Sequence, residues 1–150
     1  MNELPSPEVL AKLVSAVTNT MFGMSFSLSE PLSATPWSTS PAWHTAVLPI
    51  GGPRPLTVAV SSDHAGAQAL CCAMFSCPVE ELDPSMIDDS MSELVNILAG
   101  QLKRLLGVNH ALGLPRMLSA SGEVVGSEGW HSATMRSVTA EVRFWVAVGE

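Results

Sequence analysis

Hydrophobic and polar residues follow a helical period over the stretch 83–107, which is the longest uninterrupted pattern of its kind in the chain. At about 100° per residue, apolar side chains recur at intervals of three and four and gather on one side. This pattern predicts an amphipathic helix that packs on a core with its apolar side. The residues of that side are Ile87, Met91, Leu94, Leu98, Leu102 and Leu105.

The ends of the same stretch carry residues that favour a helix. Asp83 followed by Pro84 is typical of an N-cap and a first helical residue. Gly107 is a typical C-terminal stop. Lys103 and Arg104 lie near the end, where positive charge suits the helix macrodipole. The sequence therefore predicts where this helix begins and ends.

A second amphipathic helix is predicted near the N-terminus. Ser6 and Pro7 provide an N-cap and a first helical residue, and Gly23 can end the helix. The apolar residues at helical spacing are Leu10, Leu13, Val14, Val17 and Met21. The Ser-, Thr- and Pro-rich stretch 25–41 that follows is expected to form a loop or an irregular edge strand.

Two strands and a short helix are predicted in the middle of the chain. Residues 42–50 and 56–61 are apolar and β-branched, and the intervening GGPRP suits a hairpin connection. Ser62 or Asp63 can cap a helix over 65–75, where alanines permit close packing. Pro78 is expected to end that helix.

The C-terminal third reads as strands. The segment 110–119 contains Leu114 and Pro115, so we expect a strand with proline at an edge or entry position. Strands are also predicted over 130–138 and 141–148, the last with alternating apolar residues. The order of helix, two strands, two helices and about three strands predicts an α+β fold, with a mainly antiparallel sheet and helices packed on one face. We expect one domain over residues 1–150.

Composition excludes several classes of function. The 150 residues are 47% hydrophobic and 14% charged, which is typical of a globular protein. The net charge of −7 argues against a nucleic-acid or anionic-membrane surface, because both need a basic patch. No apolar run is long enough to span a bilayer, and the N-terminus lacks the features of a secretory signal. We expect a cytoplasmic protein.

The residues that most often bind metals or act as nucleophiles show no diagnostic spacing. The three cysteines are crowded into one apolar segment without a C-x-x-C pair, so we interpret them as small buried side chains. The four histidines are dispersed and predict no metal site. These residues are Cys71, Cys72, Cys77, His44, His64, His110 and His131.

The polar side of the long helix carries a row of candidate functional residues. Asp89, Glu93 and Asn96 fall within an arc of about 60°, and Gly100 and Lys103 continue the row. A solvated helix face is the simplest explanation. Asparagine is a poor residue in the middle of a helix, however, and glycine there costs about 1 kcal/mol relative to alanine. A glycine on an exposed face is useful where the backbone of another protein approaches closely.

The eight residues from Asp89 to Asn96, DSMSELVN, resemble the D/S-x-x-x-E-x-x-N signature of the CheC/CheX/FliY chemotaxis phosphatases. The longer run ELVNILAG, followed by LKRLL, is similar to CheX-type domains in particular. The strand and alanine-rich helix over 56–75 fit the same family, as does Pro115 after the long helix. The resemblance extends from about Trp43 to the end of the chain, and it implies a CheX/CheC-like α+β fold.

This resemblance implies a function. Members of the family dephosphorylate the aspartyl phosphate of a CheY-like response regulator, so the chain is expected to be a phosphatase. Carried over by position, Asn96 orients the attacking water and Glu93 pairs with a lysine of the regulator. Asp89, Gly100 and Lys103 are expected to contribute to partner binding. The phosphorylated aspartate and its Mg²⁺ belong to the regulator, so no cofactor or metal is expected on this chain.

Two alternatives remain open at this stage. A CheX-like domain can bind a response regulator or another signalling protein without catalysis, in which case the motif serves recognition alone. An unrelated structural or dimerising α+β domain would leave the polar row as solvated surface. CheX-type proteins are typically dimers joined through their sheets, so a homodimer is also expected, with the apolar final strand as its edge.

Overall fold

The computed structural model describes residues 6–23, 27–29, 43–52, 55–107, 111–117, 130–136 and 141–148. The helical elements are α1 (Pro7–Phe22), α2 (His64–Phe75), the 3₁₀ turn η1 (Val79–Glu81) and α3 (Pro84–Leu106). The strands are β1 (Ser27–Ser29), β2 (Trp43–Ile50), β3 (Leu56–Asp63), β4 (Arg116–Met117), β5 (Trp130–Arg136) and β6 (Glu141–Val148).

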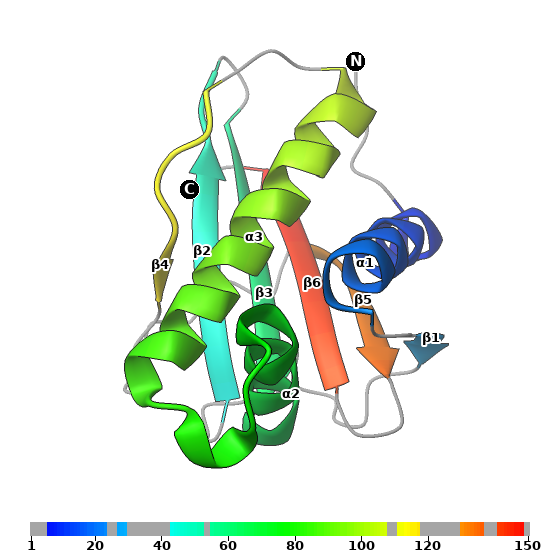
Figure 1. Cartoon of the computed structure of the whole chain (residues 1–150). Coiled ribbons are helices and arrows are strands. Elements are labelled where there is room, and N and C mark those ends of the chain that lie inside the picture. Colours follow the sequence, from blue (N-terminus) through cyan, green and yellow to red (C-terminus); the bar gives the residue numbers. More distant parts are fainter. Residues whose placement is uncertain are drawn as a thin grey trace.

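The strands form one antiparallel sheet in the order β1-β5-β6-β3-β2-β4. The helices lie together on one face of it, and α3 crosses the sheet diagonally in front of β2, β3 and β6 (Figure 1). On the same face, α1 lies beside α3 and over β5. The helix α2 lies over the C-terminal end of β3. The predicted α+β fold with helices on one face of an antiparallel sheet is confirmed.

The hairpin of β2 and β3 forms the part of the sheet on which α3 packs. Its register pairs Ile50 with Leu56 at the turn and Trp43 with Asp63 at the open end. The strand β3 runs two residues beyond the predicted 56–61, and α2 begins directly after it at His64. The helix α2 ends at Phe75, ahead of Pro78 as predicted.

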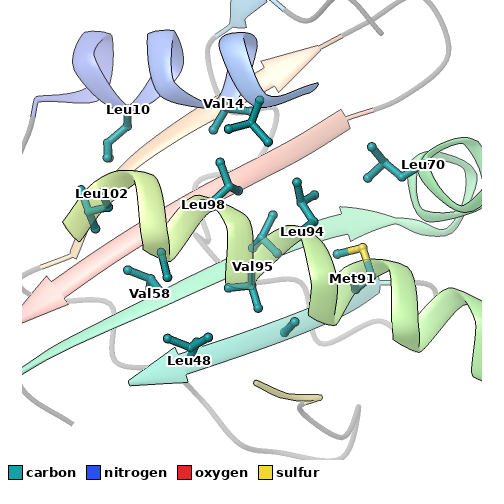
Figure 2. Packing of buried hydrophobic residues seen from close by; sticks show 14 of the residues in the cluster. Leu10, Val14, Leu48, Val58, Leu70, Met91, Leu94, Val95, Leu98 and Leu102 are labelled. Atoms are coloured by element: carbon teal, nitrogen blue, oxygen red, sulfur yellow. The ribbon is translucent and has the colours of Figure 1, made fainter. Parts of the chain in front are cut away.

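The hydrophobic core lies between the three helices and the sheet. Leu94, Val95 and Leu98 of α3 belong to one buried cluster with Leu48 of β2 and Val58 of β3 (Figure 2). The apolar side of α3 is buried as predicted at Ile87, Met91, Leu94, Leu98 and Leu102. The prediction for Leu105 is wrong, because its side chain is 51% exposed in the last turn and Leu106 packs against the core instead.

The N-terminal helix is capped as predicted. The Ser6 hydroxyl accepts a hydrogen bond from the Val9 amide, and Gly23 ends α1 in the left-handed conformation at φ 64°. Leu10 and Val14 are fully buried, whereas Met21, which follows the same helical spacing, is 54% exposed. The polar residue Thr18 is buried in that part of the helix, and its hydroxyl donates to the Val14 carbonyl at 2.8 Å.

The edges of the sheet are β1 and β4, which differs from the prediction for the last strand. The strand β6 pairs with β5 on one side and β3 on the other, so its apolar residues belong to an interior strand. Its predicted role as a dimerising edge is wrong. The stretch 25–41 was expected to be a loop or an irregular edge strand; its described part is the edge strand β1, and the rest lies outside the described residues. Homodimer formation stays a prediction.

The other edge carries an irregular segment that leads into β4. Leu112 pairs with Ile50, and Arg116 pairs with Val47. The chain therefore advances four residues on this segment while it advances only three on β2. The extra residue makes a β-bulge before β4, and Pro115 lies within it, consistent with the predicted proline at the entry to an edge strand. Bulges and prolines hinder edge-to-edge association of sheets.

Candidate functional site

The candidate site lies on α3, and capping fixes where that helix begins and ends. The Asp83 carboxylate accepts a hydrogen bond from the Met86 amide, with 3.0 Å between nitrogen and oxygen. Pro84 follows as the first helical residue. At the other end Gly107 adopts φ 67° and its amide donates to the carbonyls of Lys103 and Arg104. Both predicted ends are confirmed. Because the apolar residues of α3 fix its rotation on the sheet, they also decide which residues face away from it.

The structure places the predicted polar row on the side of α3 that faces away from the core. The side chains of Asp89, Glu93 and Asn96 are exposed, and Gly100 and Lys103 are half-buried. All five therefore lie at or near the surface of the protein.

The spacing of the row allows one partner to contact several of its members. Asp89 and Asn96 are separated by about 10 Å along the helix axis, and Glu93 and Asn96 by about one turn. No hydrogen bond or ion pair joins the side chain of Glu93 or Asn96 to another residue that the structure describes. A carboxylate accepts hydrogen bonds, and a carboxamide both donates and accepts them. The pair can therefore bind a cationic group and position a water molecule.

Gly100 has no steric reason to be glycine within the described part of the chain. A Cβ atom built at this position meets no atom within 4 Å, and the helix is regular there. Alanine would stabilise a helix at such a position by about 1 kcal/mol. The glycine is therefore unexplained by the packing of the chain on itself, which favours a role in close approach by another molecule.

Acidic residues surround the N-terminal half of α3. No lysine or arginine occurs between positions 55 and 102, and the first basic residue after this gap is Lys103. Such a one-sided charge distribution attracts a cationic surface. The exposed carboxylates of η1 and α3 are Glu80, Glu81, Asp83, Asp88, Asp89 and Glu93.

The cysteines are not suited to nucleophilic chemistry. Cys71 is fully buried on α2, and all three thiols are free. Burial is the main cause that raises the pKa of the Cys71 thiol, which disfavours the reactive thiolate. The interpretation of Cys71 as a small buried side chain is confirmed, while Cys72 and Cys77 are only half-buried.

The histidines hold one arrangement that the sequence analysis missed. His44 and His64 lie in direct contact, with Nε2 of the first 2.9 Å from Nδ1 of the second. The predicted hairpin contained the signal for this contact, because pairing Ile50 with Leu56 brings position 44 opposite 62. His110 and His131 carry no described side chain. Within the described ranges, no three His, Cys, Asp or Glu residues are grouped as metal ligands.

Among the helices that the structure describes, none is long and apolar enough to cross a bilayer.

Comparison with known proteins adds a family and a fold. The family model described as chemotaxis phosphatase CheX matches residues 44–133, which is more than half of the chain and includes all of α3. No curated protein matches the sequence.

Solved structures share the fold over nearly the whole chain. The chemotaxis protein CheX from Vibrio vulnificus superposes with a TM-score of 0.74 at 14% identity and covers 93% of both chains. CheX from Desulfovibrio desulfuricans gives 0.72 at 15% identity, covering 95% of this chain and 97% of its own. A chain of the CheX–CheY–BeF3–Mg²⁺ complex from Borrelia burgdorferi superposes with a TM-score of 0.72 at 13% identity. The match covers 99% of this chain and 100% of that chain.

At these identities the structural matches establish the fold, whereas the family model matches the sequence itself and spans the helix that bears the polar row. The chain therefore belongs to the CheX family of chemotaxis phosphatases.

Proposed function

We propose that this protein hydrolyses the aspartyl phosphate of a CheY-like response regulator, with Glu93 and Asn96 of α3 inserted into the regulator's active site. The observation that carries the proposal is the position of these two side chains. They are exposed, one helical turn apart, and without described partners in a chain of the CheX family. The CheX of Borrelia burgdorferi forms a complex with CheY, which supports a regulator of this class as the partner.

Asn96 is the catalytic residue in this proposal. Phosphoryl transfer needs a nucleophile in line with the bond that breaks, and a protein accelerates it mainly by positioning and by electrostatic stabilisation. The Asn96 carboxamide accepts a hydrogen bond from the attacking water and donates to a phosphoryl oxygen, so it holds the water on the line of attack. The water oxygen forms a bond to phosphorus as the bond from phosphorus to the aspartyl oxygen breaks. The products are hydrogen phosphate, which keeps one proton of the water, the free aspartate carboxylate and one proton released to solvent.

Glu93 anchors the partner. Its carboxylate accepts a charge-assisted hydrogen bond from a lysine of the regulator, which is shorter and stronger than a neutral one. Because Glu93 lies one turn from Asn96, this contact fixes the distance between the carboxamide and the phosphoryl group. The surrounding acidic residues of η1 and α3 favour the approach of a cationic surface.

The other members of the row assist docking. Asp89 lies one turn before Glu93 and extends the acidic surface, Gly100 leaves room for the partner's backbone, and Lys103 offers a positive charge at the far end of the row. The Mg²⁺ ion that phosphoryl transfer requires is assigned to the regulator, so this chain contributes no metal ligand.

The decisive experiment measures the decay of phosphorylated response regulators from the same genome, with Mg²⁺ present, with and without this protein. Acceleration that the Asn96→Ala variant lacks supports the proposal. Unchanged decay for every regulator contradicts it. The binding-only alternative predicts a different combination: the protein associates with a regulator carrying BeF3 in place of the phosphoryl group, yet leaves the decay rate unchanged.

A further inference from the structure

The C-terminal end of α2 brings two half-buried cysteines together. The Cys77 amide donates a hydrogen bond to the Cys72 carbonyl, with 3.3 Å between nitrogen and oxygen. Ser76, which lies between them, has a φ of 52° in the left-handed region. A hydrogen bond of this span across a left-handed residue is the Schellman motif, in which a helix ends and the chain turns back. Cys72 therefore lies in the last turn of α2, and Cys77 is the second residue after its end.

This hydrogen bond brings the two Cα atoms into the range of a disulfide. The donor nitrogen lies about 1.5 Å from the Cα atom of its own residue, and the acceptor oxygen lies about 2.4 Å from that of its residue. Since the path through both atoms bends, the two Cα atoms are less than about 7 Å apart. Disulfides usually join Cα atoms that are about 4.4–6.8 Å apart. The backbone therefore holds the two cysteines at a separation that a disulfide can span.

The side chains at these two positions of a Schellman motif contact each other. In this motif the second residue after the helix packs on a residue of the last turn, and here both are cysteines with free thiols. Burial is the main cause that raises the pKa of the Cys72 thiol, and the neighbouring Cys77 raises it further, as expected for close thiols. Cys71 is fully buried, whereas Cys72 and Cys77 are half-buried. Solvent therefore reaches the pair that the motif brings together.

We propose that Cys72 and Cys77 form a thiol–disulfide exchange site, which a low-molecular-weight disulfide such as oxidised glutathione converts to an intramolecular disulfide at the end of α2. One cysteine thiolate attacks a sulfur of the small disulfide, so that a mixed disulfide forms and one small thiolate leaves. The other cysteine thiolate then attacks the protein sulfur of the mixed disulfide and releases the second small thiolate. The two cysteine protons pass to the two departing thiolates. Two cysteines are thereby oxidised, and one small disulfide is reduced to two thiols.

The charges around the pair favour the disulfide over the thiolates. Burial is the main cause that raises the pKa of both thiols, and carboxylates of η1 raise it further, Glu80 for Cys72 and Glu81 for Cys77. Strongly oxidising cysteine pairs have a thiolate of low pKa that stabilises the reduced form. This pair lacks that stabilisation, so its disulfide should resist reduction. Its small thiolate fraction at neutral pH makes exchange slow, so the pair is a site of modification and not a catalytic nucleophile.

The disulfide would connect the last turn of α2 to the segment that leads through Pro78 into η1. Because the folded chain positions the two thiols, the bond should form more readily in the native protein than in the unfolded chain. The same factor must then appear as added stability of the oxidised native state. This inference is independent of the proposed function, since neither cysteine belongs to the polar row of α3.

The pairing is tested by equilibrating the whole protein with mixtures of oxidised and reduced glutathione. After quenching in acid and alkylation of the unfolded chain, the wild type should pass from three alkylated cysteines to one. Cleavage after Phe75 should leave the fragments on either side linked. The Cys71→Ala variant retains only Cys72 and Cys77 and should form the bond at the same glutathione ratio. Absence of an intramolecular disulfide in both proteins would overturn the proposal. A Cys72→Ser variant that joins Cys71 to Cys77 as readily would also overturn it.

The same equilibration in concentrated guanidinium chloride separates the effect of the fold from proximity in sequence. The equilibrium constant for forming the disulfide should be at least about tenfold larger in the native protein than in the unfolded chain. The oxidised protein should accordingly have a higher Tm than the reduced protein. Equal constants in the two states, or a lower Tm after oxidation, would overturn the proposal, because the turn at the end of α2 would then contribute nothing to the bond.

Discussion

Glu93 and Asn96 lie three residues apart on α3, and both side chains are exposed on the face of the helix that points away from the sheet. About 4.5 Å of helix axis separates them, which is close enough for one partner surface to contact both. The intervening Leu94 and Val95 are fully buried in the core and hold the helix in place. The two polar residues can therefore be substituted without disturbing the packing, and their effects on docking and on hydrolysis can be separated.

Asn96→Ala should abolish most of the phosphatase activity and leave the fold intact. Loss of the group that positions the water should slow the decay of the phosphorylated regulator by about 10²-fold relative to the wild type. Because Asn96 is exposed and its side chain makes no described hydrogen bond, the free energy of unfolding should change by less than about 0.5 kcal/mol. Regulator decay and thermal unfolding, measured on the same preparation, check both expectations. Equal phosphatase rates in wild type and variant would remove Asn96 from the mechanism.

Glu93→Gln should weaken docking more than it slows hydrolysis in the bound complex. The substitution keeps the size of the side chain and removes its charge, so the ion pair with the lysine of the regulator becomes a weaker hydrogen bond from the ammonium to an uncharged amide oxygen. We expect a higher Kd for a BeF3-loaded regulator and a smaller dependence of that Kd on salt concentration. Titration at two salt concentrations measures both. The neighbouring Ser92→Ala change, outside the row, is the matched control and should leave the salt dependence unaltered.

Gly100→Ala should stabilise the protein and impair its association with the regulator. A Cβ at this position meets nothing within 4 Å, and alanine is favoured over glycine in a helix by about 1 kcal/mol. The Tm should therefore rise, while the added methyl group should reduce affinity for the regulator if the partner's backbone approaches here. A variant with a higher Tm and unchanged affinity would show that Gly100 is no contact point.

The amphipathic pattern of α3 was sufficient to predict its ends, its buried side and its polar row. Caps and helical period are local, and the residues that specify them lie within a few positions of their effect. The exposure of residues at the helix ends depends on longer-range packing. Leu105 and Met21 have the correct spacing, but each lies in the last turn of its helix and is largely exposed. The interior position of β6 depends on how strands distant in sequence are ordered, which local alternation does not encode.

The contact between His44 and His64 was also not predicted, because it joins residues that are distant in sequence. The hairpin that brings the two residues together was predicted. The contact emerged only when its register was combined with the start of α2 at His64, one residue earlier than predicted. The roles of Glu93 and Asn96 are different again. Exposure and spacing describe where the side chains are, whereas their chemistry depends on a partner that is separate from this chain.

Gly113→Ala should destabilise the edge of the sheet. The Gly113 amide donates to the Pro49 carbonyl at 2.7 Å, and a Cβ at position 113 would lie 2.5 Å from Cγ of Pro49. Pro49 is a rigid ring within β2, so the segment before β4 has to move away and lose the hydrogen bond. We expect a lower Tm, with a cost of about 1–3 kcal/mol as for overpacked sites. Gly100→Ala is the matched control, since the same substitution in open space should have the opposite sign. A Tm equal to or above that of the wild type would contradict this account of the edge.

Asp83→Ala should lower the Tm near neutral pH, and the difference from the wild type should narrow in acid. The hydrogen bond from the Ser85 hydroxyl is the main cause that lowers the pKa of Asp83 from its ordinary value of 3.8. The hydrogen bond from the Met86 amide lowers the pKa further. A carboxyl group whose pKa is lower in the folded state contributes stability above its unfolded pKa and loses that contribution as the pH falls through the folded value. The comparison is thermal unfolding of wild type, Asp83→Ala and Asp83→Asn at pH 7 and at pH 2.5. Asparagine is also a good N-cap but carries no charge, so Asp83→Asn should lie between the other two at pH 7 and show no titration of its own. A difference between Asp83→Ala and wild type that is independent of pH would assign the stabilisation to helix geometry alone and exclude a contribution from the ionised carboxylate.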